Sequence, residues 1–138
     1  MNVVVDTNVI AYYLLRTEPF AEECKTFWRG ASEVAAPSSW ESELANVLWF
    51  AIRAGVLDLA QGTEHLRIAR ELGVSSVPVN HLWEGALTRA VAVDHPAYDT
   101  LFVELAHRLK RPLATFDATV LRLFPDVAKR PRDLVESH

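Results

Sequence analysis

The sequence is poor in the features that mark secreted, membrane-spanning and fibrous proteins. It has one cysteine, Cys24, so an internal disulfide is excluded and a reducing, cytoplasmic setting is expected. No apolar run approaches the ~20 residues of a spanning helix, and the first residues lack the pattern of a signal peptide. Apolar residues make up 50% and charged residues 23%, which excludes disorder, collagen and coiled coil. These values predict one globular domain over residues 1–138, with no membrane partner.

An excess of positive charge is also missing. The chain carries 14 Lys and Arg against 18 Asp and Glu, a net charge of −4, so a nucleic acid would need a local basic patch or a bound cation. The glycine-rich phosphate loops and the serine-hydrolase elbow are absent, which excludes those nucleotide-binding and hydrolase classes. The five histidines show no zinc-binding spacing.

Short strand-like runs alternate with helical segments along the chain. Residues 3–5, three valines, predict a buried parallel strand, and a helix is expected over 7–15. Further strands are expected near residues 34–36, 74–79, 113–115 and 127–128. Pro78 predicts that the strand at 74–79 is short or lies at an edge. The alternation predicts an α/β fold with a mainly parallel central sheet of four or five strands, flanked by about seven helices.

Helix starts are marked by capping residues. Ser38 with Glu41, and Asp58 with Gln61, have the spacing of capping boxes. Asn80 is expected to cap a helix that runs through residue 93.

Two aspartates follow predicted strands. Asp6 ends the first strand and Asp117 lies just past the fourth, at the carboxyl edge where open α/β sheets place their sites. Both positions also suit a helix N-cap, and that structural interpretation stays open for each.

Two further acids lie at the margins of apolar helix faces. At ~100° per residue, Glu43 projects beside the buried stripe of its helix, where a carboxylate needs a partner. A salt bridge to an arginine is the structural alternative. Asp99 borders the apolar face that starts at Tyr98, and a favourable position in the first helical turn is its alternative. Thr100 and Glu104 are expected on the solvated side of that helix.

Four acids on four elements suggest one shared cluster. Gathered carboxylates raise one another's pKa unless a cation neutralises them. Oxygen ligands without a Cys or His set favour Mg²⁺ or Mn²⁺ over zinc.

Four segments, in this order, resemble the motifs of the PIN-domain ribonucleases: residues 3–8 (VVVDTN), 43–48 (ELANVL), 98–106 (YDTLFVELA) and 115–117 (TFD). The resemblance spans residues 2 to about 124. In length and layout the chain most resembles the VapC-type toxins of toxin–antitoxin pairs.

This resemblance implies a Mg²⁺- or Mn²⁺-dependent endoribonuclease. The family's four acids match Asp6, Glu43, Asp99 and Asp117, as catalytic residues and metal ligands, with Glu43 either binding metal or orienting the attacking water. Asn8 and Thr115 match small polar residues that support the site. Many relatives carry a further acid or amide shortly after the fourth acid, whereas residues 118–120 here are Ala, Thr and Val. The sequence therefore leaves open whether the site binds one metal ion or two.

The family also implies partners: an RNA substrate, an antitoxin protein and a second copy of the chain. Arg16, close to Asp6 in sequence, is a candidate RNA contact. Trp49 lies on the expected water side of its helix, and together with Tyr12, Tyr13 and Phe20 it suggests an exposed aromatic surface for protein contacts. Two alternatives are an inactive PIN-like interaction module and a haloacid-dehalogenase-type phosphatase, whose second aspartate would fall at Asn8.

Overall fold

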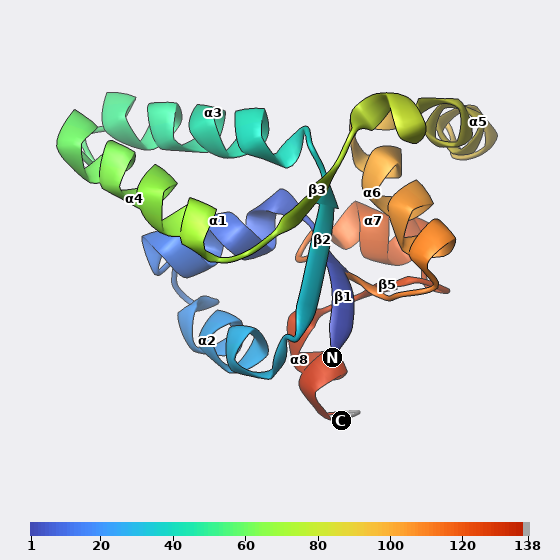
Figure 1. The fold of residues 1–138 in the computed structure, drawn as a ribbon, viewed down its shortest axis with the longest axis horizontal. Helices are drawn as coiled ribbons and strands as arrows, with labels where there is room; N and C mark the ends of the chain where they lie inside the picture. Colours follow the sequence, from blue (N-terminus) through green and yellow to red (C-terminus); the bar gives the residue numbers. More distant parts are fainter. Residues whose placement is uncertain (137–138) are drawn as a thin grey trace.

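A five-stranded, fully parallel sheet runs through the protein (Figure 1). The computed structural model describes residues 1–136. The strand order is β3-β2-β1-β4-β5. The strands are β1 (Asn2–Val5), β2 (Glu33–Pro37), β3 (Ser75–Val77), β4 (Leu113–Ala114) and β5 (Ala128–Lys129). The valines of β1 are fully buried because β1 is the central strand, and β3 lies at an edge as predicted.

Eight α-helices and one 3₁₀ turn surround the sheet within the described residues. They are α1 (Thr7–Leu15), α2 (Ala21–Gly30), α3 (Trp40–Arg53), α4 (Leu59–Glu71), η1 (Val79–His81), α5 (Trp83–Val93), α6 (Ala97–Leu109), α7 (Ala118–Leu123) and α8 (Pro131–Glu136). The prediction for α1 is confirmed at both ends, and the α/β class with its parallel sheet is confirmed. The sequence analysis missed α8, a single short helix after the last strand. No helix in residues 1–136 is long and apolar enough to cross a membrane.

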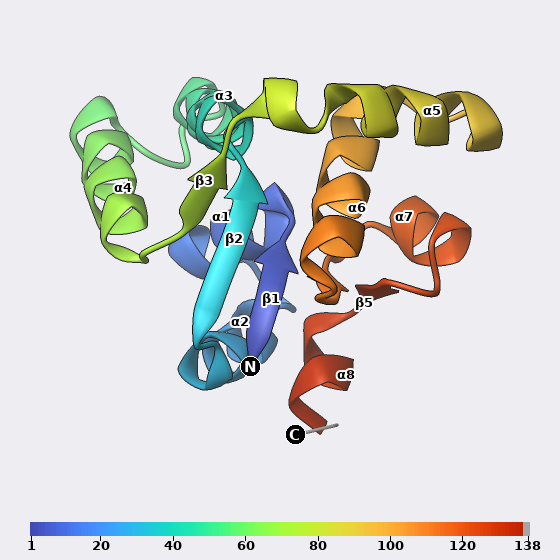
Figure 2. The same ribbon diagram turned by 45° about the vertical axis from the view of Figure 1, so that its right-hand side comes forward.

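The helices cover both faces of the sheet (Figure 2). Helix α6 packs against β1 and β2 on one face and carries α5 on its outer side, while α1 contacts α2, α3 and α4 on the other face. The carboxyl ends of β1 and β2 point toward the end of the molecule where α3 and α5 lie, and the N-terminus and α8 lie at the opposite end. A site of the α/β type is therefore expected between α1, α3 and α6.

The two capping boxes have different outcomes. The box at the start of α4 is confirmed: Gln61 N donates to Asp58 Oδ1 at 2.8 Å, and Asp58 N donates to Gln61 Oε1 at 2.9 Å. The predicted box of Ser38 with Glu41 is wrong, because the Glu41 carboxylate turns to the sheet edge and accepts from Ser76 Oγ at 3.0 Å. Asn80 is not a helix cap either; it lies in η1, and α5 begins three residues later.

The predicted faces of α6 are wrong at three residues. Thr100 is fully buried and donates to the Ala86 carbonyl at 2.7 Å, and Glu104 is only 8% exposed. Helix α5 covers this side so closely that a Cβ atom at Gly85 would overlap the Glu104 carboxylate. Tyr98, expected on the buried face, is 76% exposed because it lies in the first turn beyond the edge of the packed core.

Candidate active site

Four carboxylates from four elements line one cleft at the carboxyl edge of the sheet. Asp6 ends β1, Glu43 and Asp99 lie in the first turns of α3 and α6, and Asp117 precedes α7. All four border the same cleft of about 340 Å³. The structure thus brings together the four acids that the sequence analysis singled out.

Asp6 is the most constrained of the four. Its Oδ1 accepts from Thr7 N at 2.8 Å, and its Oδ2 accepts from Thr115 Oγ1 at 2.8 Å and from Asn8 Nδ2 at 3.4 Å. Burial, with added repulsion from the Asp99 and Glu43 carboxylates, raises the pKa of Asp6 to about 7 despite these hydrogen bonds. No lysine or arginine in the described chain pairs with it. The site therefore holds a carboxylate whose charge the protein itself does not neutralise.

Glu43 is also short of partners. Its Oε2 accepts from Thr7 Oγ1 at 3.2 Å, but its Oε1 is buried and has no hydrogen-bond partner among the described residues. The Ser39 hydroxyl lies near enough to favour the charged form, but its geometry makes no hydrogen bond and its oxygen is unpaired too. Burial nevertheless raises the pKa of Glu43. The arginine salt bridge considered as an alternative is not present in residues 1–136.

The other two acids each have one oxygen engaged. Asp117 Oδ1 accepts from the Thr119 and Val120 amides at 2.8 and 3.0 Å, so this residue is an N-cap as well as a cleft residue. Asp99 Oδ2 lies 2.6 Å from His95 Nε2. The second oxygen of each carboxylate has no hydrogen-bond partner in the described chain.

Asn8 and Thr115 join the two strand-end turns. Asn8 Oδ1 accepts from Phe116 N at 3.2 Å, and Asn8 Nδ2 donates to Thr115 Oγ1 at 3.4 Å. The same Thr115 oxygen accepts from Asp117 N at 3.0 Å and donates to Asp6. The two predicted supporting residues thus fix the position of Asp117 relative to Asp6.

The donor chemistry of the cleft fits a divalent cation. All four acids offer oxygen, the Glu43 Oε1 atom is buried without a partner, and the like charges raise the Asp6 pKa. In residues 1–136, no three Asp, Glu, His or Cys side chains converge closely enough to hold an ion as they stand. Three of the acids keep one oxygen that accepts no hydrogen bond from the protein. Rotation of these side chains could therefore bring ligands to a cation without breaking existing hydrogen bonds.

Sequence reasoning missed two polar residues of the site. Thr7 links the Asp6 backbone turn to Glu43, and His95 contacts Asp99. The four-residue spacing from His95 to Asp99 is the only sequence signal for the second contact, and the intervening Pro96 hides it because a helix starts there.

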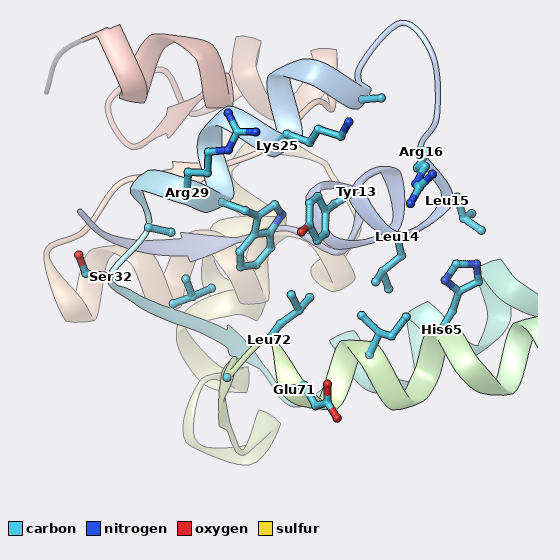
Figure 3. Close-up of a pocket in the computed structure, with 16 residues that line it drawn as sticks. Tyr13, Leu14, Leu15, Arg16, Lys25, Arg29, Ser32, His65, Glu71 and Leu72 are labelled. Atoms are coloured by element: carbon cyan, nitrogen blue, oxygen red, sulfur yellow. The ribbon is translucent and has the colours of Figure 1, made fainter.

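A larger hollow of about 830 Å³ lies between α1, α2 and α4, away from the acids (Figure 3). Arg16, Lys25, Arg29 and His65 contribute its basic groups. Arg16, the candidate RNA contact, therefore lines this hollow and not the acid cleft.

Comparison with known proteins places these features in context. The sequence profile of the PIN domain matches residues 3–129. The fold is similar to a chain in the crystal structure of VapBC2 from Rickettsia felis bound to a DNA fragment from their promoter, with a TM-score of 0.65 and 13% identity. That match covers 94% of this chain and 98% of the other, and at such low identity it establishes the fold alone. No curated protein matches the sequence.

Proposed function

The chain belongs to the PIN-domain family, and from that premise we propose that it is a Mg²⁺- or Mn²⁺-dependent endoribonuclease that hydrolyses RNA phosphodiester bonds. One observation carries the proposal. Asp6 and Glu43 are buried or half-buried carboxylates in a shared cleft, their pKa values are raised, and no basic side chain of residues 1–136 compensates them. Such an arrangement is costly unless a cation binds there.

Asp6, Asp99 and Asp117 are the residues that would hold the cation. When bound, a divalent metal lowers the pKa of a water molecule and offsets charge on the phosphoryl oxygens. Thr115 and Asn8 keep the Asp6 carboxylate fixed by donating hydrogen bonds to it. These contacts pre-orient one ligand before the substrate arrives.

Glu43 suits the role of orienting the attacking water. Thr7 holds its Oε2, while the unpaired Oε1 remains able to accept a proton or a hydrogen bond. The raised pKa of Glu43 moves the carboxylate closer to the range in which a general base acts near neutral pH.

The test uses purified protein and a mixed-sequence single-stranded RNA. Cleavage is expected with Mg²⁺ or Mn²⁺ and is expected to stop with EDTA. Activity that survives EDTA, or that survives Asp6→Asn, contradicts the proposal. Hydrolysis of small phosphomonoesters without RNA cleavage would favour the phosphatase alternative, and metal binding without any hydrolysis would favour an inactive PIN-like module.

We further propose that the chain is the cytoplasmic toxin of a toxin–antitoxin pair, with its antitoxin seated in the hollow between α1, α2 and α4. Arg16 and Arg29 make no ion pair in the described chain, and Tyr13 and Trp28 contribute aromatic surface. A partner segment with apolar and acidic side chains would match this lining. Arg29→Glu is expected to weaken the binding of a co-purified antitoxin, while the free protein still cleaves RNA.

A homodimer is part of the same proposal. Trp83, Leu87 and Val91 recur every four residues on α5 and are 59–75% exposed, and Trp49 and Phe50 are exposed on α3. Both helices lie at the same end of the molecule (Figure 1). Leu87→Glu is expected to convert a dimer to a monomer in light scattering, whereas an unchanged mass would remove α5 from the interface.

A further inference from the structure

An aromatic cluster borders the acid cleft on the side of α1. Tyr12 stacks on Phe20, with ring centroids 4.9 Å apart and planes inclined by 10°, and contacts Phe116 at 5.3 Å. Phe20 and Phe116 contact each other at 4.8 Å. Among the three, Tyr12 is the ring that lines the cleft together with the four acids. Tyr12 is partly exposed and borders the cleft, and its ring is supported there by the two phenylalanines.

The cluster is fixed to the acids by short connections. Tyr12 lies one helical turn after Asn8, on the same face of α1. Phe116 directly precedes Asp117, and its amide donates to Asn8 Oδ1. The position of the aromatic surface relative to the carboxylates is thus set by the same hydrogen bonds that set the site.

Behind the cluster, Arg130 is held in place and neutralised. Its guanidinium lies 5.5 Å from the Phe20 ring centre and 5.4 Å from that of Phe116. Glu23 accepts from Arg130 Nε at 3.2 Å and from Nη2 at 3.0 Å. The guanidinium supports the rings from the rear, and its own charge is satisfied inside the protein.

The cleft itself offers no basic side chain. Among the described residues that line it, none is Lys, Arg or His, and apolar groups of Ala11, Leu15 and Val47 form much of the rest. A polyanion in this cleft gains little from direct phosphate neutralisation by the chain. An unpaired base, in contrast, gains from stacking on an aromatic face, whatever its charge environment.

We propose that Tyr12, supported by Phe20 and Phe116, is the surface on which an unpaired nucleobase beside the scissile phosphate stacks. This inference rests on the proposed ribonuclease function and names the residue that binds a base beside the cut. Tyr12 is then a substrate-binding residue that sets which nucleotide lies next to the cut. A duplex, whose bases are already stacked and paired, cannot use it without local opening.

The chain provides a matched control in the neighbouring residue. Tyr13 is also a half-buried tyrosine of α1, but it contacts Trp28 at 5.8 Å and lines the larger hollow instead of the cleft. Tyr12→Leu and Tyr13→Leu therefore remove the same ring from the same helix on two different sides. Tyr12→Phe keeps the stacking ring and removes only the hydroxyl.

The experiment maps the cut sites of the wild type on a mixed-sequence single-stranded RNA with Mn²⁺, and then measures kcat/KM on one mapped substrate. Tyr12→Leu is expected to lose about 5- to 150-fold, mainly through KM, the usual effect of removing a stacked base contact. Tyr13→Leu is expected to stay near wild type, whereas Tyr12→Phe, which keeps the ring, is expected to retain clearly more activity than Tyr12→Leu; all melting temperatures are recorded.

A second substrate series separates stacking from a general effect on the fold. Each nucleotide beside the cut is replaced in turn by an abasic one. At one position the wild type is expected to lose the same 5- to 150-fold, and Tyr12→Leu is expected to lose almost nothing more there. Multiplicative losses at every position, or an unchanged kcat/KM for Tyr12→Leu, overturn the stacking proposal alone. A wild type that cleaves no RNA overturns the ribonuclease function, and with it this inference.

Discussion

Asp6 and Glu104 have the same exposed fraction, 8%, yet the pKa values of their carboxyl groups are shifted in opposite directions. Glu104 accepts from Arg89 Nε and from Arg108 Nε, both at 3.0 Å. Although burial opposes it, these hydrogen bonds and positive charges hold the pKa of Glu104 below its usual value. Asp6 has hydroxyl, amide and backbone donors only, and its pKa is raised to about 7.

The difference separates a scaffold carboxylate from a site carboxylate. Where α5 packs on α6, the chain supplies its own cations and the ionised glutamate joins the two helices. In the cleft, Glu43 and Asp99 add negative charge around Asp6, which protonation or a bound cation would relieve. A low exposed fraction by itself therefore does not identify a functional acid; the depth at which the carboxyl group is buried and the charges around it do.

The largest effect expected from this comparison is on RNA cleavage. Asp6→Asn is expected to lower kcat/KM by at least about 10²- to 10³-fold, because a metal's charge stabilisation of the transition state is worth several kcal/mol. The measurement is initial cleavage rate in Mn²⁺, normalised to folded protein. Glu104→Gln is the control, since it removes a carboxylate of the same low exposed fraction that lies outside the cleft, and it is expected to keep the wild-type rate. Equal loss in both variants would erase the distinction between the two regions.

A second prediction concerns pH. Because the folded-state pKa of Asp6 is above its usual 3.8, its contribution to stability is fully present below that value and is lost as the pH rises to about 7. In EDTA, the free energy of unfolding is therefore expected to fall between about pH 5.5 and pH 8, by at most ~1.4 kcal/mol per unit of pKa difference.

Urea unfolding of wild type and Asp6→Asn at both pH values isolates this contribution. The variant is the reference because the Glu43 and Asp99 carboxylates also act on Asp6, so only the difference between the two proteins reports on Asp6 itself. Mn²⁺ is expected to flatten the fall, since metal binding favours the ionised carboxylate. The same slope in wild type and variant would mean that the Asp6 pKa is ordinary.

The sequence predicted much of the fold because its signals are local. Three consecutive valines specify β1, and the Asp58–Gln61 spacing specifies the start of α4. The Ser38–Glu41 spacing failed because a tertiary partner, Ser76 on the neighbouring strand, competes for the glutamate. Helix α8 was missed because its 6 residues are too few to show a helical periodicity of apolar side chains.

The candidate site was predictable for a different reason. Acids at the edges of apolar helix faces need a partner, and parallel strands gather their carboxyl ends at one edge of the sheet. The sequence did not indicate which helix or strand packs on each face of a given helix. Glu104 and Thr100 look solvated on a helical wheel of α6 alone, and only the packing of α5 buries them. The contact of His95 with Asp99 likewise depends on how the chain turns at Pro96.

A third prediction tests the scaffold half of the comparison. Glu104→Gln is expected to lower the free energy of unfolding by about 1–3 kcal/mol, the cost of leaving charged hydrogen-bond donors poorly paired. Denaturant melts measure it, with and without Mn²⁺, and the loss should be the same in both. Glu64→Gln is the control, because its ion pair with Arg67 lies at the protein surface, and it is expected to unfold like wild type. A loss that Mn²⁺ reverses would link Glu104 to the site.

The smallest expected effect has the opposite sign and comes from Glu43. Glu43→Gln removes a carboxyl group whose pKa is raised by burial, and it keeps an oxygen that can accept a hydrogen bond from the Thr7 hydroxyl. The new amide also brings a donor to the buried Ser39 oxygen, which has no partner in the described chain. The variant is therefore expected to be more stable than wild type in EDTA by ~0.5–2 kcal/mol, a common gain when a strained functional site is relieved.

The stabilisation of the Glu43→Gln variant by added Mn²⁺ should be smaller than that of wild type if Glu43 contributes to metal affinity, since ligand-linked stability scales with affinity. Thermal melts of both proteins in EDTA and in Mn²⁺ measure the two effects together. A variant that melts lower than wild type in EDTA would show that the Glu43 charge already has a stabilising partner, and that the cleft resembles the Glu104 cluster after all.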